Sequence, residues 1–249
     1  MRGVILAAGK GARLNGTAAD RPKCLVKIGG VSLLERQIDA LRAAGVRDIV
    51  VVVGCQADRV RREAGAGVTI VENPRFAETN SLYSLWLARG SLPGGFIALN
   101  CDVLFHPRLL DDLLTARYED ALLVAPRESS APYGSEEMKV TVRAGRVVAM
   151  SKSLDPAEAD GENVGIVRFG PSGARVLVDI MDRTIAGGRL RDWAPYAFER
   201  FASERPLYAI GTRGLPWIEI DFPEDYSRAV GEVLPLIENA TALAGEGAA

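Results

Sequence analysis

Gly3-Val4-Ile5-Leu6-Ala7-Ala8-Gly9-Lys10-Gly11-Ala12-Arg13-Leu14 opens the chain and is followed, after a polar segment, by Arg21-Pro22-Lys23-Cys24-Leu25-Val26-Lys27-Ile28-Gly29. Residues 4–8 form a short apolar run bounded by glycines, which predicts a buried strand. Gly9 and Gly11 then allow a sharp turn and a close approach of the backbone to a ligand. Because the N–H groups of such a turn can point inward and bind an anion, the stretch predicts a strand followed by a phosphate-binding loop.

Positive charge lies close to these glycines. Arg13 and Lys23 add fixed positive charges to the region, and Pro22 restricts the backbone just before Lys23. These features suit the binding of a nucleoside triphosphate. On the glycines alone, an ordinary strand and glycine turn is an equally good interpretation. The phosphate-loop pattern G-x-x-x-x-G-K-[ST] is absent, and Leu14 stands where the dinucleotide-binding pattern has its third glycine.

The composition restricts the class of protein. A chain of 249 residues suits one large α/β domain with a small insertion. The net charge of −2 gives no indication of a nucleic-acid or membrane surface. Three cysteines without a C-x-x-C pattern argue against a disulfide framework or a zinc site and favour a reducing compartment. The sequence shows neither a signal peptide nor an apolar run of about 18 residues, so we expect a cytoplasmic protein.

Strand and helix patterns alternate through the first half of the chain. The predicted strands cover residues 4–8, 48–53, 68–71, 96–100 and 121–125. The helices between them are predicted to begin at the capping box of residues 32–35, at residue 57, at Asn80 and at Pro107. This order predicts an α/β fold with a doubly wound, mostly parallel, Rossmann-like sheet and helices on both faces. In such a fold the ligand binds at the carboxyl ends of the strands.

The pattern changes after Pro126. A polar loop, a hairpin and three further strands are predicted over residues 127–137, 138–150, 163–169, 207–211 and 217–220. Helices are predicted over residues 172–185, 193–202 and 222–239. Asp192 is the predicted N-cap of the helix over residues 193–202.

These elements predict a single domain over residues 1–240. We interpret residues 1–126 as a nucleotide-binding half, residues 127–211 as a small strand-rich, acceptor-binding insertion or lid, and residues 212–240 as a return to the core that carries a metal ligand. Residues 241–249 are rich in glycine and alanine and predict a flexible tail.

Asp102 and Asp221 each follow a predicted strand directly, where a doubly wound fold binds its ligand. Two carboxylates at strand ends can hold Mg²⁺, which prefers oxygen ligands and bridges substrate phosphates. Each aspartate alone is better explained as a helix N-cap. Their combination with the glycine loop favours metal binding. Glu219 alternates with its apolar neighbours, shares a face with Asp221, and is a weaker candidate for a third ligand.

Several other polar residues have two interpretations each. Lys152, at the end of the predicted hairpin, is either a solvated surface residue or, if the hairpin covers the cleft, a partner of the acceptor's phosphate. Lys139 and Arg75 have the same alternatives, and the surface is the better one for both. Asn80 and Ser81 open a predicted helix, where they cap the helix or contact a base edge, because an amide pairs with both donors and acceptors.

The single histidine and the later aromatic residues add less. His106 is the one histidine, so a histidine-dependent triad or a poly-histidine metal site is excluded. Trp193, Tyr196 and Phe198 are predicted to be core or lid residues. An aromatic cage for a quaternary ammonium group is the less favoured alternative for these three side chains.

The N-terminal motif L-A-A-G-K-G-x-R-L, followed by R-P-K-C-L, resembles the signature of the nucleotidylyltransferases, which transfer a nucleotidyl group onto phosphorylated small molecules. Later segments are similar to the phosphocholine and phosphonate cytidylyltransferase branch: T-N-S-L-Y-S-L at 79–85, M-S-K-S-L at 150–154, G-E-N-V-G-I at 161–166 and W-I-E-I-D at 217–221. Asn100-Cys101 departs from that branch, in which many members carry glycine or serine, and the acceptor region matches no choline cage.

The resemblance implies a role for each segment. The loop would hold the base and phosphates, Arg13 and Lys23 would bind the triphosphate, and Lys152 would meet the acceptor phosphate. Asp102 and Asp221 would ligate Mg²⁺. The loop residues are Leu6, Ala7, Ala8, Gly9, Lys10 and Gly11.

The implied reaction transfers CMP from CTP to a small phosphate or phosphonate acceptor, phosphocholine-like or phosphonate, and releases pyrophosphate. The acceptor oxygen is already anionic and attacks the α-phosphorus in line, so no protein nucleophile or general base is required. Related alternatives use sugar 1-phosphates with UTP or dTTP, or GTP with a molybdenum cofactor. A catalytically idle nucleotide-binding regulator is a further alternative, although it would more naturally lack the metal carboxylates. The sequence is compatible with an oligomer and does not identify the acceptor.

Overall fold

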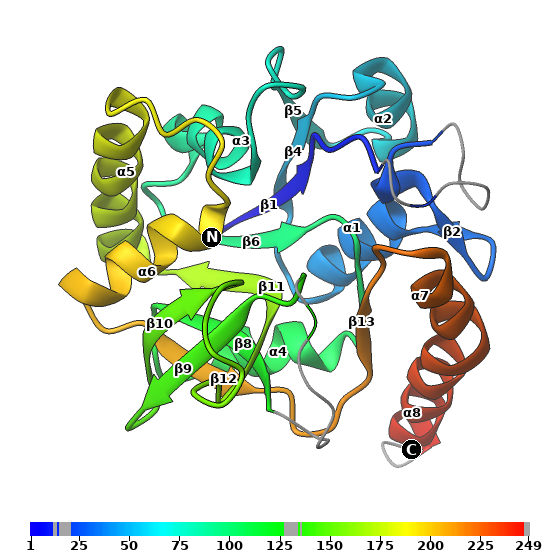
Figure 1. The fold of residues 1–249 in the computed structure, drawn as a ribbon. Helices are drawn as coiled ribbons and strands as arrows, with labels where there is room; N and C mark the ends of the chain where they lie inside the picture. The colour runs from blue at the N-terminus through cyan, green and yellow to red at the C-terminus, as the bar shows by residue number, and fades with distance from the viewer. Residues whose placement is uncertain (12–13, 15–20, 127–133, 135, 247–249) are drawn as a thin grey trace.

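The computed structural model describes residues 1–11, 14, 21–126, 134 and 136–246 (Figure 1). Its strands include β1 (Arg2–Ala7), β4 (Asp48–Val53), β5 (Val68–Glu72), β6 (Phe96–Asn100), β8 (Ala121–Pro126), β9 (Lys139–Arg143), β10 (Arg146–Ser151), β11 (Gly161–Phe169) and β12 (Tyr208–Gly211). In the described part of the chain these strands form one nine-stranded sheet, in the order β5-β4-β1-β6-β11-β8-β12-β10-β9.

The sheet is mixed, and most of its strands run in the same direction. β1 pairs in parallel with β4 and β6, β4 with β5, and β8 with β12. β11 lies between β6 and β8 and is antiparallel to both, so β8 runs in the same direction as β6. β10 is antiparallel to both β12 and β9, so β10 and β11 run opposite to the other seven strands. The predicted doubly wound sheet, with most strands in one direction, is therefore confirmed.

Helices cover both faces of the sheet, as Figure 1 shows. The face formed by Val4 and Leu6 of β1 packs against α3 (Ser81–Leu87), α5 (Pro171–Ala186) and α6 (Ala194–Glu204). The opposite face, with Ile5 and Ala7, packs against α1 (Leu33–Ala43), α2 (Ala57–Ala64) and α4 (Arg108–Thr115). Successive side chains of a strand point to opposite faces, so these continuous apolar strands need cover on both sides.

The strand-rich part predicted as an insertion, residues 127–211, is built into this sheet. The β9–β10 hairpin forms one edge, whereas β11 and β12 lie inside the sheet, on either side of β8. Val164, Ile166 and Phe169 of β11 are buried, because helices cover both faces at this point. The part of residues 127–211 that the structure describes thus completes the core instead of forming a separate lid.

Two pairs of short strands lie outside the main sheet in the described part of the chain. β2 (Lys27–Ile28) and β3 (Val31–Ser32) form one antiparallel pair. β7 (Val103–Phe105) follows β6 after a short turn and pairs with β13 (Trp217–Glu219) in an antiparallel ladder. Leu104 of β7, Ile218 of β13 and Ile220 just after β13 are buried and join a third apolar cluster with the C-terminal helices. The sequence predicts β13 but not β7, because three residues carry too little periodicity to indicate a strand.

Several predicted helix ends are confirmed and one is wrong. Ser32 accepts a hydrogen bond from Glu35 N (3.2 Å) and caps α1, and Asn80 accepts one from Ser81 N (2.8 Å) and caps α3. Asp192 does not cap α6. The N-cap residue is Trp193, and Asp192 pairs with Arg189 instead.

The C-terminal helix also differs from the prediction. It divides into α7 (Pro223–Arg228), a π-helical segment (Ala229–Val233) and α8 (Leu234–Glu246). α8 therefore continues into the range for which the sequence predicts a flexible tail, and the last three residues of that range lie outside the described residues.

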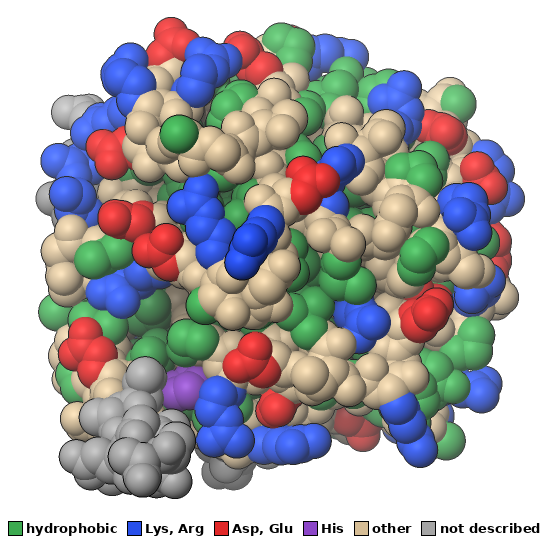
Figure 2. All heavy atoms as spheres, turned by 180° about the vertical axis from the view of Figure 1, so that it is seen from behind, with side chains coloured by type: hydrophobic (Ala, Val, Ile, Leu, Met, Phe, Trp, Pro, Cys, Tyr) green, Lys and Arg blue, Asp and Glu red, His purple; other side chains and the backbone are tan. Residues whose placement is uncertain are grey.

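Among the described residues, no helix combines the length and the apolar character that a membrane span requires. On the face turned to the viewer in Figure 2, basic and acidic side chains are interspersed, in keeping with a net charge of −2.

We expect Ser32→Ala to lower the free energy of unfolding by about 1 kcal/mol, because it removes the side-chain cap of α1. Urea denaturation followed by circular dichroism measures this change. Ser203→Ala, at an exposed position within α6, is the matched control and should change stability by less than about 0.5 kcal/mol. Equal effects of the two substitutions would show that the Ser32 cap contributes nothing specific.

Candidate active site

A cavity of about 360 Å³ opens at the carboxyl ends of β1 and β6, where the fold predicts the ligand. Most of the residues that the sequence singles out line it: Leu6, Ala8, Gly9, Gly11, Lys23, Asn80, Ser81, Asp102, Lys152, Glu219 and Asp221. Ala7 and Lys10 do not. Ala7 is buried in the apolar cluster on the opposite face of the sheet, and Lys10 is exposed with its Nζ 5.8 Å from the ring centroid of Phe76. Arg13 lies outside the described residues.

The glycine loop after β1 lies against the segment that carries Lys23. Gly11 has a φ of +66°, a conformation that favours glycine. A Cβ atom at this position would lie 2.7 Å from Lys23 Cγ and 3.1 Å from Lys23 N. Gly11 therefore permits both the turn and the close approach of Lys23, so the two parts of the N-terminal motif form one wall of the cavity.

The β7–β13 ladder brings three carboxylates together on another wall. Glu219 pairs with Val103 in the ladder, and Ile220 N donates a hydrogen bond to Asp102 O (3.0 Å). An oxygen from each of Asp102, Glu219 and Asp221 lies within 4.8 Å of the other two. Residues more than a hundred positions apart in the chain thus converge because two short strands pair.

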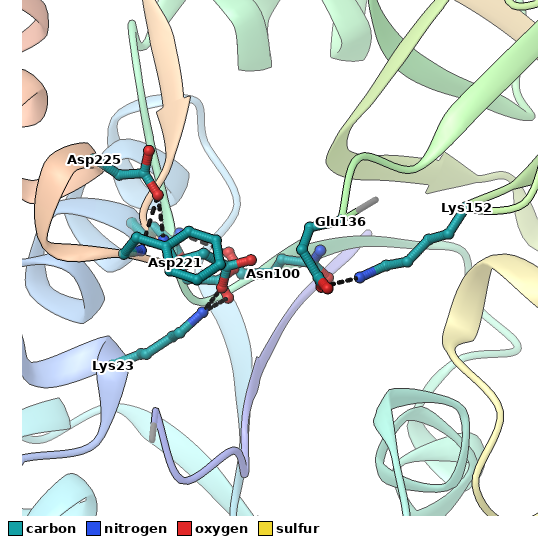
Figure 3. A network of polar contacts seen from close by, with 9 residues as sticks. Lys23, Asn100, Glu136, Lys152, Asp221 and Asp225 are labelled. Carbon is teal, nitrogen blue, oxygen red and sulfur yellow. Dashed lines mark hydrogen bonds and ion pairs between the residues drawn. The ribbon is translucent and has the colours of Figure 1, made fainter. Parts of the chain in front are cut away.

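Neither aspartate caps a helix. The N-cap residue of α4 is Pro107, and that of α7 is Phe222. Asp225 Oδ2 accepts hydrogen bonds from the backbone N atoms of Asp221 and Phe222 (3.0 and 2.9 Å), so Asp225 performs the capping role. The Asp221 carboxylate instead faces the cavity with Lys23, as Figure 3 shows.

Lys23 lies between two of these carboxylates (Figure 3). Its Nζ is 3.2 Å from Asp102 Oδ2 and forms a second ion pair with Asp221 Oδ1. The Lys23 side chain is 11% exposed, so these charges interact with little solvent screening. One ammonium group therefore faces three acidic side chains.

Glu219, the third acidic group of the cluster, has a raised pKa. Burial, with the nearby charge of Asp102, raises the pKa of Glu219 to about 8, and Lys23 offsets only part of the shift. Asp102 Oδ1 is buried and has no hydrogen-bond partner among the described residues. Three carboxyl groups, one of which has a buried oxygen without a partner among the described residues, fit Mg²⁺, which prefers carboxylate oxygens. A cation bound here would favour the deprotonated form of Glu219.

Asn73, Asn80 and Ser81 line the side of the cavity next to α3. Asn80 caps α3, so its base-edge and capping roles are compatible in this geometry. Ser81 Oγ accepts a hydrogen bond from Ala194 N (2.8 Å) and so connects α3 to α6.

Asn73 is a cavity residue that was not predicted from the sequence. It is 1% exposed, and its side-chain amide donates hydrogen bonds to Thr79 Oγ1 and Ser84 Oγ (both 3.0 Å). Its position one residue after β5 is a signal that the strand-end rule could have used.

Lys152 points into the opposite side of the cavity. Its Nζ is 2.9 Å from Glu136 Oε2, as Figure 3 shows, and 4.4 Å from the ring centroid of Trp193. Trp193 Nε1 is buried and has no hydrogen-bond partner among the described residues. Asn100 and Glu136 also line the cavity. Asn100 ends the predicted strand 96–100, so the strand-end rule could have indicated it, whereas no pattern in the sequence indicates Glu136.

Phe198 and Arg75 lie where the sequence predicts them, whereas Lys139 does not. Phe198 is buried in the core, as predicted, and Arg75 lies at the surface in a pair with Glu78. The surface interpretation of Lys139 is wrong, because this residue is 2% exposed and directly opposite Glu162 in the β9–β11 pairing. An acidic partner across the strand pair makes its burial tolerable.

Glu162 is a second acidic group with a perturbed pKa. Burial raises the pKa of Glu162 to about 7, the charge of Glu137 adds to this shift, and Lys139 opposes it. Glu162 lies close enough to Glu219 to raise the pKa of Glu219 as well. Acidic groups therefore extend from the carboxylate cluster towards the side of the cavity that contains Lys152.

A cavity in this position is where doubly wound α/β proteins bind nucleotides. The chain belongs to the family described as MobA-like NTP transferase domain, whose model matches residues 3–209. Structural similarity agrees with this assignment. The inositol-1-phosphate CTP transferase of T. maritima superimposes with a TM-score of 0.77 over 95% of this chain and 96% of that chain. At 22% identity, it shows a shared fold.

Relatives of this chain include enzymes named as cytidylyltransferases or CMP-phosphonate synthases, and also a mannose-1-phosphate guanyltransferase of Yarrowia lipolytica. The choline-phosphate cytidylyltransferase of Streptococcus pneumoniae is 28% identical over 94% of this chain and 98% of its own length. The CMP-5'-(3-aminopropyl)phosphonate synthase of Streptomyces rubellomurinus is 30% identical over 92% of this chain and 38% of its own length. The bifunctional IPC transferase and DIPP synthase of Rubrobacter xylanophilus is 32% identical over 89% of this chain and 49% of its own length. The chain thus spans half or less of two of these relatives. The resemblance indicated by the sequence motifs is confirmed.

Glu162→Gln should stabilise the protein at high pH. The folded protein keeps the Glu162 proton up to about pH 7, whereas the ordinary pKa is 4.5, so the wild type loses stability as the pH rises from 4.5 through 7. We expect the variant to be more stable than the wild type by about 3 kcal/mol above pH 8 and equally stable below pH 4. Urea denaturation at several pH values measures the difference.

Glu63→Gln, at an exposed position in α2, is the control and should leave the pH dependence of stability unchanged. A stability difference between Glu162→Gln and the wild type that is constant with pH would contradict the assigned pKa shift.

Proposed function

We propose that this protein transfers CMP from CTP to a small phosphate or phosphonate acceptor and releases pyrophosphate. The observation that carries the proposal is the contact of Lys23 with two members of a three-carboxylate cluster, opposite a glycine loop in one cavity. The names of the relatives, which include a choline-phosphate cytidylyltransferase and a CMP-phosphonate synthase, support CTP as the nucleotide. Family membership makes nucleotidyl transfer the expected class of reaction.

The residues of this chain suit catalysis that works by positioning the substrates and by stabilising charge. The glycine loop would hold the phosphates through its backbone N–H groups, and Lys23 would stabilise the charge that develops on the transferred group. Arg13 would add a second positive charge to the triphosphate. Bound at Asp102, Glu219 and Asp221, Mg²⁺ would supply charge neutralisation at the phosphates. Because the acceptor oxygen is anionic at neutral pH, the cavity needs no general base.

The nucleotide would occupy the side of the cavity next to α3. Asn73 and Asn80 are there, together with hydroxyl groups of Thr79, Ser81 and Ser84. A buried hydrogen-bonding group that loses its partner costs ~1–3 kcal/mol. Cytosine and uracil differ in an amino group against a carbonyl, so a polar wall built for one base discriminates against the other. This supports a preference for a single pyrimidine nucleotide.

The acceptor would occupy the side that contains Lys152, Glu136 and Trp193, all of which line the cavity. Residues 127–211 supply all three, which supports an acceptor-binding role for this part of the chain. Lys152 offers a cation for the acceptor phosphate or phosphonate. A hexose would require several neutral partners for its hydroxyl groups, whereas the side chains here are mainly charged or aromatic. A compact anion is therefore the better fit.

The thiols support a proposal for the cellular compartment. Cys24, Cys55 and Cys101 are free cysteines in the structure, and two of them are buried. Free buried thiols suit a reducing environment, which supports the proposal that the protein acts in the cytoplasm.

The test of nucleotide and acceptor measures pyrophosphate release. CTP, UTP, dTTP, GTP and ATP are each combined with phosphocholine, 3-aminopropylphosphonate, inositol 1-phosphate and glucose 1-phosphate. We expect the highest kcat/KM with CTP and with phosphocholine or the phosphonate. A higher value for glucose 1-phosphate with UTP or dTTP would replace the proposal by a sugar nucleotidylyltransferase. Nucleotide binding without turnover of any pair would indicate a regulator.

Lys23→Ala should lower kcat about a hundredfold, because one preorganised charge contact to the transition state contributes roughly 3 kcal/mol. The far-ultraviolet circular dichroism spectrum should match that of the wild type. Lys27→Ala, an exposed lysine in the same segment, is the control and should retain wild-type kcat. A folded Lys23→Ala protein with near-normal kcat would refute the role of Lys23.

A further inference from the structure

Gln37 is a buried polar residue in the middle of α1, outside the cavity of the candidate active site. It is 1% exposed. Its side-chain Nε2 donates two hydrogen bonds, to Asn100 O (2.8 Å) and to Val103 O (2.9 Å). These two carbonyl groups flank the turn that carries Asp102. We propose that Gln37 is a positioning residue, which fixes the Asp102 carboxylate for cation binding through the backbone of this turn.

The turn is held from two sides. On one side, the Gln37 amide ties together the last residue of β6 and the first residue of β7. On the other side, Asp102 O accepts a hydrogen bond from Ile220 N, which lies between Glu219 and Asp221. The contact with Ile220 sets the distance between Asp102 and the other two carboxylates. The contact with Gln37 keeps the turn from moving away from the sheet when charge in the cluster changes.

Packing alone does not explain a glutamine at this position. Leu34, Ile38 and Leu41 of α1 are apolar and fill the same face of the sheet. Gln37 Oε1 is buried and has no hydrogen-bond partner among the described residues. A buried acceptor without a partner is unfavourable, and an apolar side chain would avoid that cost. The donor half of the amide therefore has a role that an apolar residue would not fulfil.

The orientation of the amide follows from its neighbours. Two carbonyl oxygens face Nε2, so the reversed amide would place Oε1 against both of them and lose both hydrogen bonds. Only a donor fits here. Gln37→Met keeps the length of the side chain and removes the donor, and Gln37→Glu keeps the shape but presents acceptor oxygens to the two carbonyl groups.

The inference rests on the proposed cation site at Asp102, so its test has one measurement that needs no cation. Hydrogen–deuterium exchange of the metal-free protein compares the peptide covering residues 96–105 with a peptide from α2. We expect faster exchange at residues 96–105 in Gln37→Met and Gln37→Glu and unchanged exchange in α2. Unchanged exchange at residues 96–105 in both variants would overturn the proposal.

The second measurement is Mn²⁺ binding to the same proteins, followed by electron paramagnetic resonance. Loss of a group that orients a metal ligand typically weakens metal binding 10–100-fold, and we expect a loss of at least about tenfold for both Gln37 variants. Ile38→Val, a neighbouring core substitution in α1, should leave Mn²⁺ affinity within about twofold of the wild type. Equal Mn²⁺ affinities of the wild type and a folded Gln37 variant would overturn the proposal.

Asp102→Asn separates the two hypotheses. If this variant binds Mn²⁺ as tightly as the wild type, the proposed cation site is wrong, and the exchange measurement still decides whether Gln37 holds the turn. If Asp102→Asn weakens Mn²⁺ binding while the Gln37 variants do not, the cation site stands and the role of Gln37 is refuted. Gln37→Met, which buries no charge, provides the result if Gln37→Glu does not fold.

Discussion

One lysine ammonium group lies among three carboxyl groups, and the candidate active site depends on this imbalance of charge. Lys23 pairs with two of the groups, and the third, Glu219, has a pKa of about 8 because burial and the charge of Asp102 disfavour its ionised form. The cluster is therefore compact only while Lys23 or another cation stays close. Under the proposed function, a triphosphate that arrives with a divalent cation would bring both the positive charge that the carboxylates lack and the negative charge that Lys23 can bind. Ligand binding would then exchange partners within one network instead of burying uncompensated charge.

The same cluster depends on contacts between distant parts of the chain. Lys23 comes from the N-terminal segment, Asp102 from the turn between β6 and β7, and Asp221 from the segment after β13. The β7–β13 ladder and the apolar cluster beneath it, which includes Leu104 and Ile220, hold these segments together. The site is complete only when the C-terminal part has docked onto the sheet. A substitution in that apolar cluster would therefore change the geometry of the carboxylates even though it lies outside the cavity.

Local patterns in the sequence predict the parts of this arrangement that depend on local physics. Glycines after a buried strand, a serine cap and aspartates after apolar runs are each visible within a few residues, and the structure has the loop, the cap and the strand ends in these places. The rest depends on pairing between segments far apart. The sequence predicts β11 as part of an insertion, whereas in the structure it lies between β6 and β8. The residues of a strand do not specify its place in the sheet, so this position could not be predicted. From the sequence, Gln37 cannot be distinguished from other polar residues of an amphipathic helix, because the turn that it binds is far away in the chain. Lys139 looks like a surface residue until Glu162 is found opposite it.

Charge balance on the acceptor side bears on the proposed substrate. Lys152 already has the Glu136 carboxylate at 2.9 Å and the face of Trp193 at 4.4 Å, so its charge is compensated before an acceptor arrives. A phosphate that approaches Lys152 would face repulsion from Glu136 if this carboxylate stayed in place. An acceptor that carries a cationic group beside its phosphate or phosphonate would compensate both side chains at once, and the aromatic ring would accept the cation on its face. A sugar phosphate offers no such cation. The side chains around Lys152 therefore favour a compact acceptor with both charges, which agrees with the phosphocholine-like or aminophosphonate class proposed above.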